Sequence, residues 1–197
     1  MDKPWDARLA ARLVAPLRDT AVTPNHLTTV RLATGVIGVY LLARGALNAG
    51  AWLVTLSNFL DHTDGELARM TGKGSRVGHI YDLASDALIT IGMFLGLGIG
   101  IAGITGNHSA TAMGAIAGLS VAAIFHMRND MEERLGKGAT RQPNFAGFEP
   151  EDILYLLPVV THGGFAMGFL KLAAVGAPLA ALIILALFVR SRRGASA

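Results

Sequence analysis

Cysteine is absent from the 197-residue sequence, and charged residues are scarce, at 16% of the chain. A soluble domain of this size carries about 25% charged residues, so the low content argues against a soluble protein. Without cysteine there are no disulfides and no thiolate metal sites, although this does not fix the compartment. We expect no cleavable signal peptide, because residues 1–20 are studded with charge and lack an apolar core.

Charge is missing altogether from residues 87–127, which contain no Asp, Glu, Lys or Arg. One helical crossing of a bilayer takes about 20 residues, so this stretch is long enough to cross twice. The whole chain is 52% hydrophobic, with a mean hydropathy of +0.46. The sequence therefore predicts an all-α integral membrane protein that forms one domain over residues 1–197.

The basic residues give a net charge of +3, but their distribution argues against nucleic acid as a partner. They form four clusters, at residues 3–18, 69–76, 128–141 and 190–193. Nearly neutral segments alternate with these clusters, at residues 43–50, 103–112 and 168–172. This alternation follows the positive-inside rule for six transmembrane helices with both termini in the cytoplasm. We therefore expect a multi-pass protein of the inner (plasma) membrane.

Residues 3–19 predict an amphipathic helix in the cytoplasmic interface, because Trp5, Leu9 and Leu13 recur at every fourth position with arginines between them. Residues 24–193 are expected to form the six-span bundle. The expected spans are 26–43, 47–71, a third that begins near residue 77, 110–127, 153–170 and 172–189.

Four aspartates stand at helical spacings on either side of a predicted turn at residues 72–75. Asp61 and Asp64 share one helical face, and Asp82 and Asp86 share another. A short hairpin would bring both faces together at one edge of the membrane. Ionisable residues in membrane segments are costly and mark a functional site by default. Four clustered charges of one sign require a positive partner, and a divalent metal is the obvious candidate.

Ligands that are all oxygen favour Mg2+ or Mn2+ over zinc. Four carboxylates balance two such ions, and a two-metal site can stabilise the attacking and leaving oxygens of a phosphoryl displacement. A purely structural alternative is that the acids form buried salt bridges with Arg69, Lys73 and Arg76. A second alternative is a cation-binding membrane transporter that uses intramembrane carboxylates. Transporter sites usually lie near the midplane between repeated helices, and the sequence shows neither feature.

The aspartates belong to a longer pattern, which reads D-x2-D-G-x2-A-R-x8-G-x3-D-x3-D from Asp61 to Asp86. This pattern resembles the signature of the CDP-alcohol phosphotransferases (CDP-alcohol phosphatidyltransferases), integral membrane enzymes of phospholipid biosynthesis. All eight specified positions match, which by chance occurs on the order of 10^-10 times per window. A second stretch, P-N-x-x-T-x-x-R from Pro24 to Arg31, resembles the start of the family's first span.

The resemblance implies an enzyme that transfers a phosphatidyl-type group from a CDP-linked lipid, such as CDP-diacylglycerol, to an alcohol and releases CMP. It implies two Mg2+ or Mn2+ ions per site, bridged by Asp61 and Asp82. Asp64 would complete one metal site, and Asp86 the other. Asp86 would also accept the proton of the attacking alcohol, which makes it the expected catalytic residue. A homodimer is implied as well.

The resemblance and the first-span motif together give the expected CDP-alcohol site. Its residues are Asn25, Thr28, Arg31, Gly65, Ala68, Arg69, Ser75 and Gly78. Arg31 is otherwise hard to explain inside a span, and we expect the nucleotide pyrophosphate to be its partner. His62 and His79 flank the acids, but they point away from the carboxylate faces.

The core motif is shared by relatives that use different acceptor alcohols, so it does not identify the acceptor. The basic residues on the active-site side favour a polar or phosphorylated alcohol, of the glycerol phosphate or inositol phosphate type. Most of these basic residues are expected to set topology and contact anionic lipid. The candidates for holding an acceptor phosphate are Arg128, Lys137, Arg141 and Arg190.

Overall fold

The computed structural model describes residues 5–136 and 154–194, and these segments contain helices and no strands. The elements are α1 (Trp5–Val14), the 3-10 helix η1 (Ala15–Leu17), α2 (Pro24–Ala43), α3 (Leu47–Thr71), α4 (Arg76–Thr105), α5 (Ser109–Leu135), α6 (Leu157–His162) and α7 (Ala166–Gly194).

Four of the described helices are long and apolar enough to cross a membrane: α2, α4, α5 and the Ala166–Arg192 part of α7. Helix α3 has sufficient length, but its second half carries the acids of the signature and it falls outside this apolar set. The expectation of an all-α, multi-pass membrane protein is therefore supported. The count of six spans is not confirmed by these helices.

The boundary between the expected fifth and sixth spans is wrong. The sequence places a turn near residues 168–172, whereas the structure turns at residues 163–165, between α6 and α7. Gly164 has a φ of 75°, a left-handed conformation that glycine adopts without strain. Gly168 lies instead inside the continuous helix α7, where no other atom crowds it. Residues 166–170, which were expected in the fifth span, therefore belong to α7.

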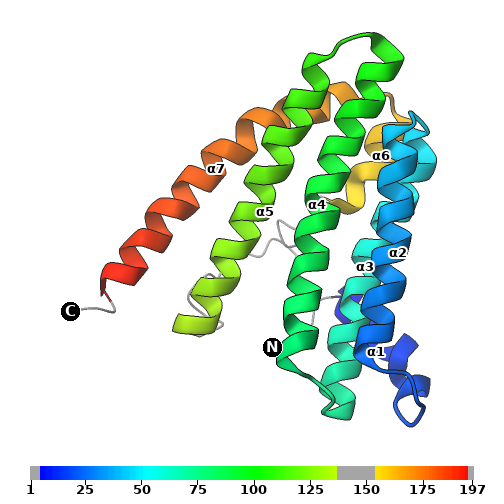
Figure 1. The fold of residues 1–197 in the computed structure, drawn as a ribbon, viewed down its shortest axis with the longest axis vertical. Coiled ribbons are helices and arrows are strands. Elements are labelled where there is room, and N and C mark those ends of the chain that lie inside the picture. Colours follow the sequence, from blue (N-terminus) through cyan, green and yellow to red (C-terminus); the bar gives the residue numbers. More distant parts are fainter. Residues whose placement is uncertain (1–4, 137–153, 195–197) are drawn as a thin grey trace.

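Helices α2, α3, α4 and α5 run side by side, and α7 packs on α5 and then diverges toward the C-terminus (Figure 1). The α3–α4 hairpin lies at the opposite end of the bundle from the α4–α5 turn (Figure 1). The apolar core occupies the half of the bundle that is remote from this hairpin, with Leu42, Leu97 and Leu170 fully buried. The hairpin half is left for polar residues, and the candidate site lies there.

Glycines allow α4 to lie directly against its neighbours. A Cβ at Gly100 would collide with the carbonyl oxygen of Leu42 on α2, and one at Gly114 on α5 would collide with that of Phe94 on α4. Small residues of this kind let membrane helices approach backbone to backbone. The close contact fixes the position of α4, and with it the position of two of the aspartates.

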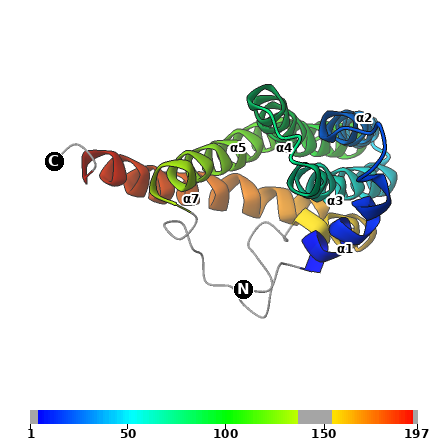
Figure 2. The same cartoon turned by 90° about the horizontal axis from the view of Figure 1, so that it is seen from below.

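Helix α1 is shorter than the expected 3–19 helix and lies beside α3 (Figure 2). Ala7, Ala10 and Val14 are buried in this contact. Leu9 and Leu13 are 43% and 55% exposed, so they form a second, outward apolar face. The placement of α1 in a membrane interface stays a prediction.

Candidate metal and nucleotide site

The α3–α4 hairpin is closed by two local features of its sequence. Gly72 ends α3 in a left-handed conformation with a φ of 66°, which favours glycine. Ser75 caps α4, because its Oγ accepts a hydrogen bond of 3.0 Å from the backbone N–H of Gly78. The hairpin thus reverses the chain within a few residues and sets the acidic ends of α3 and α4 against each other.

Three of the four predicted aspartates present oxygen atoms to a common point. Asp61 and Asp64 of α3 and Asp82 of α4 each offer a carboxylate oxygen, and these oxygens lie within 4.8 Å of one another. Asp86, one helical turn after Asp82, joins them through Arg31 of α2. The site is therefore assembled from three helices.

Arg31 lies among the four carboxylates, and its side chain is only 2% exposed. Its Nη1 is 2.5 Å from Asp61 Oδ1 and 2.5 Å from Asp86 Oδ1. Its Nη2 donates a hydrogen bond of 2.8 Å to Asp82 Oδ1, and its Nε is 3.8 Å from Asp64 Oδ2. The sequence suggests pyrophosphate as the partner of Arg31, whereas in the structure its partners are the four aspartates.

Two hydroxyl groups fix the geometry around this arginine. Thr28 Oγ1 donates a hydrogen bond of 2.6 Å to Asp64 Oδ2, which orients that carboxylate. Ser57 Oγ donates a hydrogen bond of 2.9 Å to the carbonyl oxygen of Arg31, which ties α3 to α2 at this level. Both hydroxyls are buried, so these bonds are shielded from water.

The residues fit a divalent cation. Asp61 Oδ1 is buried and accepts no hydrogen bond of good geometry, although it lies beside Arg31. One guanidinium against four carboxylates leaves an excess of three negative charges. Acids this close together repel one another, and a further positive charge at the cluster relieves this repulsion while it keeps them ionised. The donor atoms are carboxylate oxygens, which are the ligands that Mg2+ and Mn2+ prefer.

A cavity of about 170 Å³ lies beside the acids, between α2, α3, α4 and the hairpin. Asp64 and Asp82 line it. Six of the eight residues expected at the CDP-alcohol site also line it, namely Asn25, Thr28, Gly65, Ala68, Ser75 and Gly78. Gly78 of α4 leaves room for the Asn25 side chain of α2, since a Cβ there would lie 2.7 Å from Asn25 Oδ1.

The other two expected residues are placed differently. Arg31 lies among the carboxylates, and the 57% exposed Arg69 pairs with Glu66 Oε1 at 3.0 Å. Two residues that the sequence analysis did not assign to the nucleotide, Lys73 and His79, line the cavity instead. His79 also lies 2.9 Å from Glu133 Oε1 of α5. Lys73 lies in the hairpin, inside the unspecified x8 segment of the signature, and this position could have indicated that it lines the cavity.

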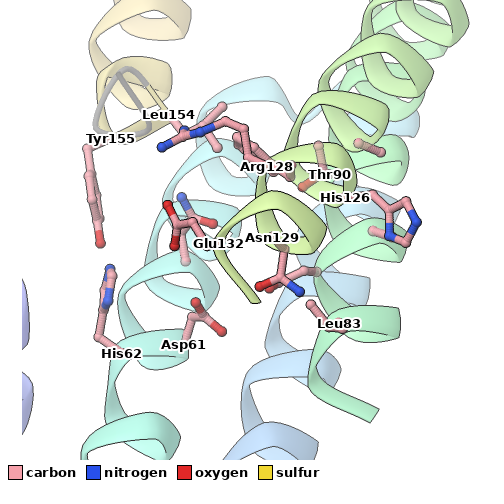
Figure 3. Close-up of a pocket in the computed structure, with 15 residues that line it drawn as sticks. Asp61, His62, Leu83, Thr90, His126, Arg128, Asn129, Glu132, Leu154 and Tyr155 are labelled. Carbon is pink, nitrogen blue, oxygen red and sulfur yellow. The ribbon is translucent and has the colours of Figure 1, made fainter. Parts of the chain in front are cut away.

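A second cavity, of about 380 Å³, opens on the other side of the cluster. Asp61 and Asp86 line it, together with residues of α5 and the segment before α6 (Figure 3). Of the four acceptor candidates, Arg128 lines this cavity. Arg190 is exposed on α7 and is not among the described residues that line it, while Lys137 and Arg141 lie outside the described residues.

Sequence reasoning missed most of the polar lining of this larger cavity. The side chains it did not assign to the acceptor are Asn58, His62, His126, Asn129, Glu132 and Tyr155. In Figure 3 the polar ends of His62 and Tyr155 point toward each other on one wall. His62 is next to Asp61, but its role depends on which helix faces it, and the sequence does not carry that information.

A family model for CDP-alcohol phosphatidyltransferases matches residues 21–191 of the chain. The match includes both motifs and every aspartate of the site. The protein therefore belongs to the CDP-alcohol phosphatidyltransferase family.

Curated relatives come from bacteria and archaea. The archaetidylinositol phosphate synthase of Pyrococcus horikoshii is 31% identical over 90 residues, covering 45% of this chain and 47% of that protein. The chain is 34% identical over 135 residues to the bifunctional IPC transferase and DIPP synthase of Rubrobacter xylanophilus, covering 66% of this chain and 31% of that protein. It is 34% identical over 116 residues to the phosphatidylinositol phosphate synthase of Cutibacterium acnes, covering 54% of each. The chain thus spans about a third to a half of the length of these relatives.

The fold is also that of a solved enzyme. The phosphatidylinositol phosphate synthase of Mycobacterium tuberculosis with CDP-DAG bound aligns with a TM-score of 0.64 and 22% identity, covering 91% of this chain and 92% of that one. The same enzyme in complex with manganese and citrate aligns with a TM-score of 0.64 and 23% identity, covering 91% and 88%. These likenesses support the fold.

Proposed function

We propose that the protein transfers the substituted phosphate of a CDP-linked lipid, such as CDP-diacylglycerol, to a phosphorylated alcohol and releases CMP. One observation carries this proposal: the four aspartates lie between two cavities. Asp64 and Asp82 line the smaller one with the expected CDP-alcohol residues, and Asp61 and Asp86 line the larger one. Group transfer needs the donor and the acceptor to be held close together in a fixed orientation. Two cavities that share one charged cluster would hold them in this way.

The acceptor we propose is of the inositol phosphate type. The larger cavity, at about 380 Å³, falls within the usual range for small-molecule sites, about 300–1,000 Å³. Arg128 would pair with the phosphate, and the amides and histidines around it would bind hydroxyl groups. Two relatives bear names that denote synthesis of inositol phosphate lipids.

The proposed metal content is two ions, Mg2+ or Mn2+, held by Asp61, Asp64, Asp82 and Asp86. When bound, the ions would neutralise charge that develops on the pyrophosphate. The residues of the chain supply the remaining functions. Thr28 fixes Asp64, the smaller cavity orients the nucleotide, and Asp86 accepts the proton of the alcohol.

We further propose six crossings, the number that the alternating basic clusters favour, in which α3 also spans the bilayer. The hairpin, the site and both termini would face the cytoplasm at the inner membrane, with α1 in the interface. A homodimer is proposed on the family resemblance alone. A cation transporter is not favoured, because the chain belongs to a transferase family.

The transfer reaction can be tested with purified protein in detergent. We expect CMP release from CDP-diacylglycerol when inositol phosphate is added, and less with glycerol phosphate, serine or no acceptor. Arg128→Gln should raise the KM for inositol phosphate about tenfold or more with a smaller change in kcat, because a charge-assisted contact is lost. Arg134→Gln on the same helix is the matched control, since Arg134 pairs with Asp130 outside the cavity. Cation uptake into vesicles without CMP release would contradict the proposal.

Metal dependence has its own test. Activity should disappear in excess EDTA and return with Mg2+ or Mn2+, because the excess negative charge of the cluster requires a cation. Ca2+ serves as the comparison, since it prefers more ligands at longer distances. Full turnover in chelator would refute the metal site.

A further inference from the structure

Arg31 makes contacts that a role in binding pyrophosphate does not explain. Its guanidinium reaches one oxygen each of Asp61, Asp82 and Asp86, at 2.5 to 2.8 Å. It is among the largest fully buried side chains of the described residues. Because this guanidinium is buried and in contact with the acids, its positive charge permanently offsets part of their negative charge.

We propose that Arg31 is an internal counter-ion that competes with the divalent metal for the same carboxylate oxygens and thereby sets the metal affinity of the site. The inference rests on the proposed metal function of the cluster. Asp61 and Asp82, two of the acids that Arg31 contacts, are the ones expected to bridge the metals. A carboxylate oxygen that binds Mg2+ at about 2.0–2.1 Å competes with the guanidinium for the same lone pairs.

Charge adds to this competition. The guanidinium and a divalent ion repel each other, and the repulsion is strong where water is excluded. Arg31 therefore weakens metal binding, and it also stabilises the ionised acids when no metal is bound. As a result, the carboxylates keep their positions at low metal concentration, and the affinity of the site for metal is moderate.

Asp64 is the exception within the cluster, because Arg31 contacts it only through Nε at 3.8 Å. Thr28 holds Asp64 instead, through the hydrogen bond of 2.6 Å to Oδ2. The competition accordingly acts through the other three acids. Ser57 keeps Arg31 at this depth, because its hydroxyl holds the backbone carbonyl of Arg31.

The test measures Mn2+ binding to the full-length protein in detergent, without any CDP-lipid, from the electron paramagnetic resonance signal of free Mn2+. Arg31→Gln should lower the Kd for Mn2+ by about ten- to a hundredfold, since a competing and repelling cation is removed. Arg44→Gln is the matched control, because Arg44 lies at the other end of α2, remote from the acids. Its Kd should equal that of the unmodified protein.

Thermal unfolding supplies a second readout. In chelator, Arg31→Gln should unfold at a lower temperature than the unmodified protein, because the acids repel one another without the guanidinium. Mn2+ should raise the unfolding temperature of Arg31→Gln more than that of the unmodified protein, as ligand linkage requires for tighter binding. Equal or weaker Mn2+ binding by a folded Arg31→Gln protein would overturn the inference.

If Arg31→Gln does not fold, the effect of removing Arg31 is measured in a protein that already lacks one of the four acids. Asp86→Asn and the double variant Arg31→Gln with Asp86→Asn are then compared, and the double variant keeps the net charge of the natural cluster. The double variant should bind Mn2+ more tightly than Asp86→Asn, and equal affinity would again refute the inference. Absence of Mn2+ binding by the unmodified protein would instead refute the proposed metal function.

Discussion

Asp86 is the most exposed of the four aspartates, and together with Asp61 it lines the larger cavity. Its side chain is 39% exposed, compared with 32% for Asp82, 29% for Asp61 and 6% for Asp64. It is also beside the cavity where we place the acceptor alcohol. A proton acceptor must lie within reach of the reacting hydroxyl, and Asp86 meets this requirement better than the enclosed Asp64 does.

Replacing Asp86 by Asn tests this role at the residue scale. The substitution keeps an oxygen ligand and nearly the same shape but removes the base. We expect kcat to fall by about 10^2- to 10^4-fold, the usual contribution of general-base catalysis. Binding of the CDP-lipid, measured by calorimetric titration, should change much less.

Asp61→Asn is the comparison for this variant, since Asp61 is expected to bridge both ions. It should lose metal binding and CDP-lipid binding together. Turnover of Asp86→Asn at close to the natural rate would show that another group accepts the proton.

At the scale of the helices, the site depends on how closely α4 lies against α2. Gly100 faces the carbonyl of Leu42 near the end of the bundle remote from the hairpin. Arg31 lies on the same α2 and contacts Asp82 and Asp86 on the same α4. We therefore expect a shift of α4 at the remote end to displace Asp82 and Asp86 relative to Arg31.

Gly100→Ala tests this helix contact. The added Cβ would collide with the Leu42 carbonyl, and overpacking of this kind costs about 1–3 kcal/mol. We expect a lower unfolding temperature in detergent and weaker metal binding.

Gly103→Ala, one turn further along α4, is the matched control, because no neighbouring atom lies within 4 Å of the position that its Cβ would occupy. It should be neutral or stabilising by up to about 1 kcal/mol, since alanine is the better helix former. Equal unfolding temperatures for the two variants would show that α4 does not depend on the close contact.

At the scale of the whole molecule, the orientation in the membrane decides which side supplies the water-soluble acceptor. The hairpin at residues 72–75 and the turn at residues 106–108 lie at opposite ends of α4, whose 30 residues exceed the length of one crossing. The alternating basic clusters predict that the hairpin faces the cytoplasm.

Single cysteines at Gly74 and Asn107 test this orientation. The natural chain has no cysteine, so labelling by a membrane-impermeant maleimide reports on one introduced site at a time. In inside-out vesicles Gly74→Cys should label and Asn107→Cys should not, with the reverse in intact cells. Labelling of both from the same side would refute the proposed topology.

The sequence by itself determined the membrane class, the hairpin and the identity of the clustered acids. These features depend on residues that are near one another in the sequence. Hydropathy is a sum along the chain, and helical periodicity places residues three or four apart on one face. The start of α3 at Leu47 and its end at Thr71 follow from the same local signals and match the expected 47–71 span.

Only the tertiary structure decided the partners of Arg31, the two cavities and the turn before α7. The sequence shows that Arg31 lies inside a span, but which groups it meets depends on the rotation and depth of α2 relative to α3 and α4. Several glycines in this apolar segment could each form the turn, and the sequence does not distinguish among them. In the structure the turn at Gly164 separates α6, which packs on α3, from α7, which packs on α5. Contacts between distant segments are set by the packing of whole helices, which local patterns do not encode.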